Sequence, residues 1–191
     1  IVETTTGNIV AYEALIRSTG DLKMEPKQIL STAANQNSLY AIEKLTFFNT
    51  MKLISENQSV FENKKLFINS MCEYSLNDED FNELYLTYGE LMEKCVIEIV
   101  EDSTVTPEAI DLIKKRLAFA HTQLAIDDYG TGYSNSTNLL KYRPDYVKID
   151  RSLISDIHND MKKQQLVTQI IDFCRDNQLQ TLAEGVETAQ E

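Results

Sequence analysis

The sequence predicts an α/β fold, a (β/α)8 barrel that is incomplete in this chain. Short apolar runs typical of strands alternate with helical patterns from Cys95 onward, which favours a parallel sheet with helices outside. Polar residues of the kind that bind metals lie at or near the ends of these runs. We count seven strand-like segments and no eighth, so closure of the barrel is not expected within these 191 residues.

The amino-terminal elements are expected in the following order. Ile1–Glu3 and Asn8–Ile16 should be strands joined by the polar turn Thr4–Gly7, which is a hairpin signal. A helix should cover Pro26–Ala34, because proline suits the first helical turn. Ser38 should cap a longer helix. The apolar residues that recur there at roughly helical spacing are Leu39, Ile42, Leu45, Phe48, Met51 and Leu53.

The rest of the chain should alternate strands and helices. Further strands are expected over Lys65–Asn69, Cys95–Glu101, Gln123–Asp127, Tyr146–Asp150 and Thr181–Gly185. Helices are expected over Asn77–Met92, Pro107–His121, a short stretch ending near Lys141, and Asp160–Asn177. A turn-rich loop, Asp128–Tyr133, should leave the Gln123–Asp127 strand.

The placement of polar residues favours a barrel over a doubly wound sheet. Asn69 and Asp127 end their strands, and Glu98, Lys148 and Glu184 lie close to the ends of theirs. In a (β/α)8 barrel the carboxyl ends of all strands converge on one mouth. A doubly wound sheet would spread six strands too widely for these side chains to meet.

Composition limits the partners. The net charge of -12 argues against long nucleic acid, although a small phosphate ligand carried in with metal is compatible with it. The three cysteines show no CxxC spacing, which indicates reduced thiols in a cytoplasmic setting. No apolar run approaches the roughly 18 residues of a membrane span, and no signal peptide is visible. The sequence is also compatible with a membrane-anchored parent protein.

Carboxylates inside apolar strands predict bound divalent metal, because an unpaired buried charge is costly. Glu13, Asn69, Glu98 and Asp127 offer hard oxygen ligands of the kind that magnesium and manganese prefer. Taken singly, each acid is more simply read as a surface carboxylate, but the whole constellation favours metal. The two histidines, His121 and His158, stand near no cysteine and in no HExxH arrangement, which argues against a histidine triad or a zincin.

Two details refine the metal hypothesis. Neighbouring residues on a regular strand face opposite ways, so Asp127 and Asp128 can share a site only where the strand breaks. Gly130 and Gly132 are expected to provide that break. Lys148 needs a counter-charge if it is buried. It is either a structural ion pair, with Glu184 or Glu187, or the group that holds or activates a water beside the metals.

Six motifs, in order and over nearly the whole chain, resemble those of the EAL domain family of cyclic di-GMP phosphodiesterases. They are Glu13-Ala14-Leu15 with Arg17, Asn69, Glu98–Glu101, Asp127–Ser134, Lys148–Asp150 and Glu184–Glu187. The resemblance implies a modified TIM barrel and two divalent metal ions, Mg²⁺ or Mn²⁺. It also implies hydrolysis of cyclic di-GMP to linear pGpG.

The resemblance also implies a role for each matching residue. One metal would be bound by Glu13, Asn69, Glu98 and Asp127, and the second by Asp127, Asp128 and Glu184. Lys148 would hold the attacking water and act in catalysis with Asp128 and Glu184. Glu101 would anchor the Asp-Asp-Tyr-Gly loop, and Glu187 would support the region of Lys148. Leu15 and Arg17 would bind substrate, with Arg17 on a phosphate.

The sequence departs from the family pattern at Ser18, Val100, Tyr129 and Asn135, and none of these removes a proposed ligand. Residues 1–191 are expected to be one EAL-type domain truncated at both ends, with the first strand clipped and the last strand missing. Sensor or GGDEF-type domains are expected in the parent protein, and a homodimer would be typical of the family. The alternatives are a catalytically silent domain that binds cyclic di-GMP or a regulatory partner, and a metal hydrolase for another phosphodiester.

Overall fold

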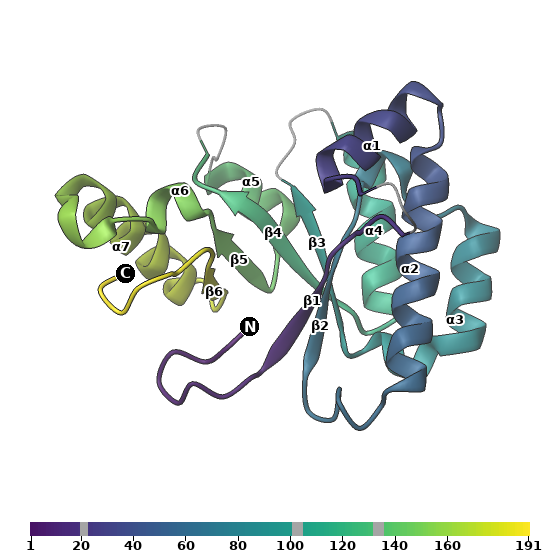
Figure 1. Ribbon diagram of the computed structural model, residues 1–191, viewed down its shortest axis with the longest axis horizontal. Coiled ribbons are helices and arrows are strands. Elements are labelled where there is room, and N and C mark those ends of the chain that lie inside the picture. The colour runs from purple at the N-terminus through teal and green to yellow at the C-terminus, as the bar shows by residue number, and fades with distance from the viewer. Residues whose placement is uncertain (20–22, 101–104, 132–135) are drawn as a thin grey trace. The chain divides into compact units, whose positions relative to one another are not determined.

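The computed structural model describes residues 1–19, 23–100, 105–131 and 136–191 (Figure 1). Its strands form a sheet in the order in which they occur along the chain. They are β1 (Ala11–Ala14), β2 (Lys65–Asn69), β3 (Cys95–Val100), β4 (Gln123–Tyr129), β5 (Tyr146–Ile149) and β6 (Gln180–Ala183). The pairs β1–β2, β4–β5 and β5–β6 are parallel. A doubly wound sheet reverses its strand order at a switch point. This sheet does not, so the sequential order of a (β/α)8 barrel is confirmed.

The predicted first strand is wrong. Ile1–Glu3 makes only one isolated antiparallel bridge, between Val2 and Ile9, and the expected Asn8–Ile16 strand shortens to β1. The turn closes through backbone hydrogen bonds from Gly7 to Glu3 and from Glu3 to Asn8. Residues 2–10 are exposed, so this hairpin has no apolar face to bury and does not extend into a ladder. The described residues therefore hold six strands instead of seven.

The chain divides into two compact units, and β3 contributes residues to both. Unit 1 comprises Ile1–Ile97 and Thr106–Thr122, and unit 2 comprises Glu98–Val105 and Gln123–Glu191. The expectation of a single domain over residues 1–191 stays a prediction, and each unit is described in turn. Among the described residues, no helix is both long enough and apolar enough to cross a membrane.

Unit 1 combines β1 and β2 with a set of helices, of which α2 packs on β2. Its helices are α1 (Pro26–Asn35), α2 (Leu39–Glu56), the 3-10 turn η1 (Cys72–Tyr74), α3 (Asp78–Met92) and α4 (Pro107–Phe119). Asn77 caps α3 by accepting a hydrogen bond from Asp80 N at 2.8 Å, and Thr106 caps α4 in the same way. Ser38 precedes α2 as predicted, but its hydroxyl donates to Gln36 O and does not cap the helix.

The buried face of α2 differs from the predicted apolar stripe. The side chains that α2 buries are Glu43, Phe47, Thr50, Met51 and Ile54. Leu45 and Leu53, which belong to the predicted stripe, are 54% and 49% exposed. The buried set keeps the i, i+4, i+7 spacing of one helix face, but it includes two polar residues that a search for apolar residues passes over.

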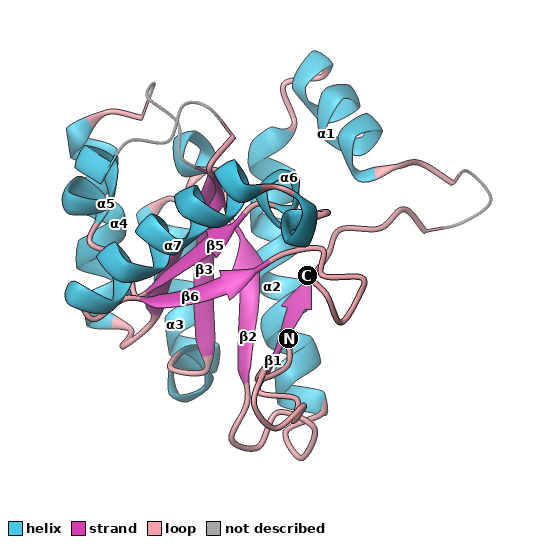
Figure 2. Cartoon of the chain, turned by 90° about the vertical axis from the view of Figure 1, so that its left-hand side faces the viewer, coloured by secondary structure: helices cyan, strands magenta, loops and turns pink. Residues whose placement is uncertain are grey.

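Unit 2 holds β4 to β6 with α5 (Ser136–Tyr142), α6 (Arg151–Ile154), the 3-10 turn η2 (Ile157–Asn159) and α7 (Met161–Asp176). Figure 2 shows α7 beside β6, which it contacts. Asp160 caps α7 by accepting hydrogen bonds from Lys162 N at 2.8 Å and Lys163 N at 3.2 Å. The short helix α6 was not predicted. Asp150 caps it through Ser152 N at 2.8 Å, so an N-cap signal was present in the sequence.

Candidate metal centre

Lys148 lies at the middle of an acidic cluster in unit 2. Its ammonium Nζ is 2.6 Å from Glu98 Oε1, 2.9 Å from Asp127 Oδ1 and 2.8 Å from Glu184 Oε1. The register of the sheet explains part of this arrangement. Lys148 is opposite Leu182 on β6, and Glu184 follows two residues later, so its side chain returns to the same face.

Charge and burial act against each other in this cluster. Lys148 is 1% exposed. Its burial alone would lower the pKa of the ammonium, but Glu98, Glu184 and Asp127 outweigh burial, and the pKa lies above its ordinary value. The pKa of Glu184 is also raised, first by burial and further by Asp127 and Asp128, although Lys148 opposes both effects. The ion pair with Glu184, one of the two alternatives for Lys148, is present.

Asp127 and Asp128 reach the same place through an irregularity inside β4. The pairing of β4 with β5 shifts register between Ile126 and Tyr129, and Asp128 has a φ of +54°. We expected the break at Gly130 and Gly132, of which Gly132 lies outside the described residues. β4 continues to Tyr129, and its register shift falls before Gly130, on the acids themselves. Bulges of this kind re-aim a side chain beside a site, and aspartate tolerates the left-handed conformation better than most residues.

Three carboxylates of unit 2 are placed so that they fit a metal ion. One oxygen from each of Asp127, Asp128 and Glu184 lies within 4.8 Å of the others. These are the hard oxygen donors that Mg²⁺ and Mn²⁺ prefer. With Glu98 they make four carboxylates against the single ammonium of Lys148, so cations would offset an excess of negative charge. The structure brings the predicted second ligand set together, and its role as a ligand set stays a prediction.

Glu13 and Asn69 form a second polar group, at the end of two adjacent strands in unit 1. Glu13 is opposite Phe67 in the β1–β2 register, so Asn69 lies two residues further along the same face. Asn69 Nδ2 is 3.4 Å from Glu13 Oε1. The convergence of these two residues with Glu98 and Asp127 on one metal stays a prediction.

Leu15 and Arg17 line a cavity of about 470 Å³ in unit 1. Its other walls come from α1 and from the side of α2 that carries Ile42, Thr46 and Asn49. Both Leu15 and Arg17 are exposed, and Arg17 Nη1 donates to the carbonyl of Ile16 at 2.7 Å. This placement leaves the guanidinium accessible to a ligand in the cavity.

The remaining predicted site residues have different positions. Glu101 lies outside the described residues. Glu187 Oε1 is 2.7 Å from Arg151 Nη2, an exposed ion pair at the start of α6. Arg151 was not singled out from the sequence. Its side chain packs so closely on Gly185 that an added Cβ there would lie 2.5 Å from Arg151 Cγ, which explains the glycine beside Glu184.

Comparison with known families decides the assignment. The EAL domain family model matches residues 1–191, the whole chain. The chain belongs to the EAL domain family. The resemblance to this family seen in the sequence is thereby confirmed.

Two curated relatives and one solved structure illustrate the range of the family. This EAL domain is 29% identical over 196 residues to the cyclic di-GMP phosphodiesterase TpdA of Vibrio parahaemolyticus, covering 88% of this chain and 33% of TpdA. It is 24% identical over 198 residues to the blue light- and temperature-regulated antirepressor BluF of Escherichia coli, covering 100% of this chain and 47% of BluF. The chain thus spans less than half the length of either relative.

The solved structure supports the fold class. The Klebsiella pneumoniae BlrP1 complex with manganese and cyclic di-GMP superimposes with a TM-score of 0.82 at 27% identity. The match covers 99% of this chain and 48% of that one. The incomplete TIM-like barrel predicted from the alternation of strands and helices is confirmed.

Proposed function

We propose that this EAL domain hydrolyses cyclic di-GMP to linear pGpG with two divalent metal ions, Mg²⁺ or Mn²⁺. The observation that carries the proposal is the cluster around Lys148, in which Glu98, Asp127 and Glu184 lie within 2.9 Å of one buried ammonium. Such a cluster contributes little to stability by itself, because desolvation offsets the attraction of buried ions. TpdA is named a cyclic di-GMP phosphodiesterase, and BlrP1 was solved with manganese and cyclic di-GMP.

The proposed ligands divide between the two polar groups. Glu13, Asn69, Glu98 and Asp127 would hold one ion, and Asp127, Asp128 and Glu184 the other. Bound there, the ions would supply Lewis-acid chemistry and would lower the pKa of bound water.

The residues of the chain have separate tasks in this proposal. Lys148 holds Glu98, Asp127 and Glu184 in place through its three short contacts, and it orients the attacking water. Asp128 is exposed and Glu184 is partly exposed, so substrate reaches these two carboxylates from solvent. Arg17 would bind a substrate phosphate, because a guanidinium forms charge-assisted hydrogen bonds to phosphate oxygens, and Leu15 would contact the substrate beside it.

The rival function is a catalytically silent domain that binds cyclic di-GMP or regulates a partner. The similarity to BluF, which is named an antirepressor, supports this second candidate. The complete acidic set argues against it, because a domain that only binds the dinucleotide has no need for the excess of negative charge around Lys148. We further propose a cytoplasmic location, a homodimer, and sensor or GGDEF-type domains elsewhere in the parent protein.

Product analysis separates these candidates. The chain is incubated with Mn²⁺ and cyclic di-GMP, and the nucleotides are resolved by ion-exchange chromatography. Accumulation of pGpG supports the proposal. Intact cyclic di-GMP that is retained by the protein indicates the silent binding domain. Intact and unbound cyclic di-GMP, together with cleavage of a generic substrate such as bis(p-nitrophenyl) phosphate, indicates a hydrolase for another phosphodiester.

A further inference from the structure

A glutamate that has no role in the proposals above is buried in the helical layer of unit 1. Glu43 is 1% exposed and lies on the inner face of α2. Its Oε1 accepts a hydrogen bond from Ser70 Oγ at 2.5 Å, and its Oε2 accepts one from Met71 N at 3.0 Å. Both donors are more than 25 residues away in the sequence.

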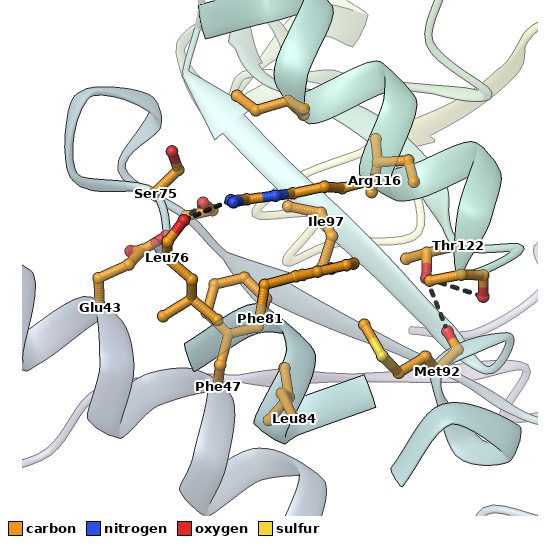
Figure 3. A pocket seen from close by; sticks show the side chains of 14 residues that line it. Glu43, Phe47, Ser75, Leu76, Phe81, Leu84, Met92, Ile97, Arg116 and Thr122 are labelled. Atoms are coloured by element: carbon orange, nitrogen blue, oxygen red, sulfur yellow. Dashed lines mark hydrogen bonds between the residues drawn. The ribbon is translucent and has the colours of Figure 1, made fainter. Parts of the chain in front are cut away.

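The surroundings of Glu43 are apolar. It borders a cavity of about 60 Å³ that is lined by Phe47 of α2, Leu84 of α3 and Ile97 of β3, together with residues of α4 (Figure 3). Arg116 lines the same cavity, but its guanidinium contacts Leu76 O and Asp78 and lies 4.8 Å from the ring centroid of Phe81. Burial raises the pKa of Glu43 to about 7, although its two hydrogen bonds act in the opposite direction.

The two donors to Glu43 lie next to a proposed metal ligand in the chain. Ser70 and Met71 directly follow Asn69, the last residue of β2. Ile68, on the other side of Asn69, is fully buried. The backbone of Asn69 is therefore fixed before it by the core and after it by the carboxylate of Glu43. Asn69 itself is exposed, so it has little packing of its own to hold its direction.

We propose that Glu43 is a positioning residue for the metal site. By holding Ser70 Oγ and Met71 N, it fixes the direction of the chain at the end of β2 and aims the side chain of Asn69 toward Glu13. The inference rests on the proposed function, because it assigns Asn69 as a ligand. Supporting residues of this kind change metal affinity without touching the metal.

The test is a titration of the metal-free full chain with Mn²⁺ alone, in which electron paramagnetic resonance measures the bound Mn²⁺. Glu43→Ala should weaken Mn²⁺ binding about tenfold. Glu43→Gln should bind within twofold of the wild type, because the amide oxygen still accepts from Met71 N and the amide nitrogen donates to Ser70 Oγ. The matched control is Asp80→Ala, which removes another buried carboxylate of unit 1 that contacts Tyr40 and Lys44. This control should lose stability and keep its Mn²⁺ affinity.

A double-mutant cycle separates positioning from a general structural effect. If Glu43 acts through Asn69, Glu43→Ala should add nothing to the loss caused by Asn69→Ala. Additive losses would show that Glu43 acts elsewhere and would overturn the proposal. If Glu43→Ala does not fold, Glu43→Asp takes its place, because the shorter side chain withdraws the carboxylate from both donors.

The outcomes distinguish this inference from the function on which it rests. If the wild-type chain binds Mn²⁺ and hydrolyses cyclic di-GMP, and Glu43→Ala binds Mn²⁺ with the same affinity, only the role of Glu43 is overturned. A wild-type chain that binds no Mn²⁺ would overturn the proposed function and this inference with it. Weakened binding in Glu43→Ala, recovery in Glu43→Gln and no further loss in the double variant support the proposal.

Discussion

Lys148 Nζ and Glu98 Oε1 are 2.6 Å apart, and both side chains are almost completely buried. Asp127 and Glu184 lie against the same ammonium. One lysine among several carboxylates organises the cluster but does not balance its charge. The hydrolysis proposed for this EAL domain should therefore depend on cations, and so should the stability of unit 2.

Lys148→Met should strongly destabilise the metal-free protein. Removing the ammonium leaves buried carboxylates without their cation, which costs about 3–5 kcal/mol in the free energy of unfolding. Urea denaturation in the presence of a chelator measures the loss. Lys52→Met is the control, since Lys52 is 65% exposed and pairs only loosely with Glu56 at 3.8 Å. The control should change stability by less than about 0.5 kcal/mol. Equal effects of the two substitutions would contradict the burial argument.

Metal should stabilise the fold. A ligand that binds the native state alone at about 100 times its Kd adds about 2.7 kcal/mol to the free energy of unfolding. Adding Mn²⁺ to the chelator-treated protein should accordingly raise Tm by several degrees, as followed by circular dichroism. The double variant Asp127→Asn/Asp128→Asn should lose this response. An unchanged Tm of the wild-type protein would count against the carboxylate cluster as a metal site.

Gly185→Ala should destabilise unit 2 by more than the same change at Gly7. Both glycines have positive φ, +63° and +70°, so alanine meets similar backbone strain, about 1–2 kcal/mol, at the two positions. At Gly185 the new Cβ would also lie 2.9 Å from Arg151 Cβ, whereas nothing lies within 4 Å of it at Gly7. Urea denaturation of the two variants isolates the contact. Equal losses would show that Arg151 moves aside freely.

Glu43 should make the protein less stable as pH rises. Its pKa is raised from 4.5 to about 7 in the folded state, so the native state binds more protons than the unfolded state between these values. This contribution to stability is fully present below pH 4.5 and is lost as pH rises through about 7. Between pH 5 and pH 8 the loss is about 2–3 kcal/mol.

Glu43→Gln isolates that contribution, because the amide does not titrate. Urea denaturation of the variant and the wild-type protein at pH 5 and pH 8 gives the difference in the free energy of unfolding at each pH. From pH 5 to pH 8, the variant should become more stable relative to the wild-type protein by about 2–3 kcal/mol. Parallel pH profiles of the two proteins would show that Glu43 titrates near its ordinary pKa.

The alternation of strands and helices was readable because buried strands and amphipathic helices leave periodic apolar patterns. The predicted strand at Ile1–Glu3 was wrong because the segment has a strand-like composition but no core to pack on. A break in the strand near Asp127 and Asp128 was predicted, but its position was not, because Gly130 and Gly132 pointed to a break after the acids. Glu43 was missed for a related reason. A glutamate in a helix looks like a surface residue until the fold brings Ser70 and Met71 to it.

Turnover by Glu13→Ala tests most directly whether the acidic residues of this EAL domain act through metal. Cyclic di-GMP hydrolysis in Mn²⁺ is measured for the wild-type chain and the variant, with circular dichroism to confirm that both are folded. The wild-type chain should release pGpG, and the folded variant should release none above background. Equal rates of pGpG release from the two proteins would contradict the ligand assignment.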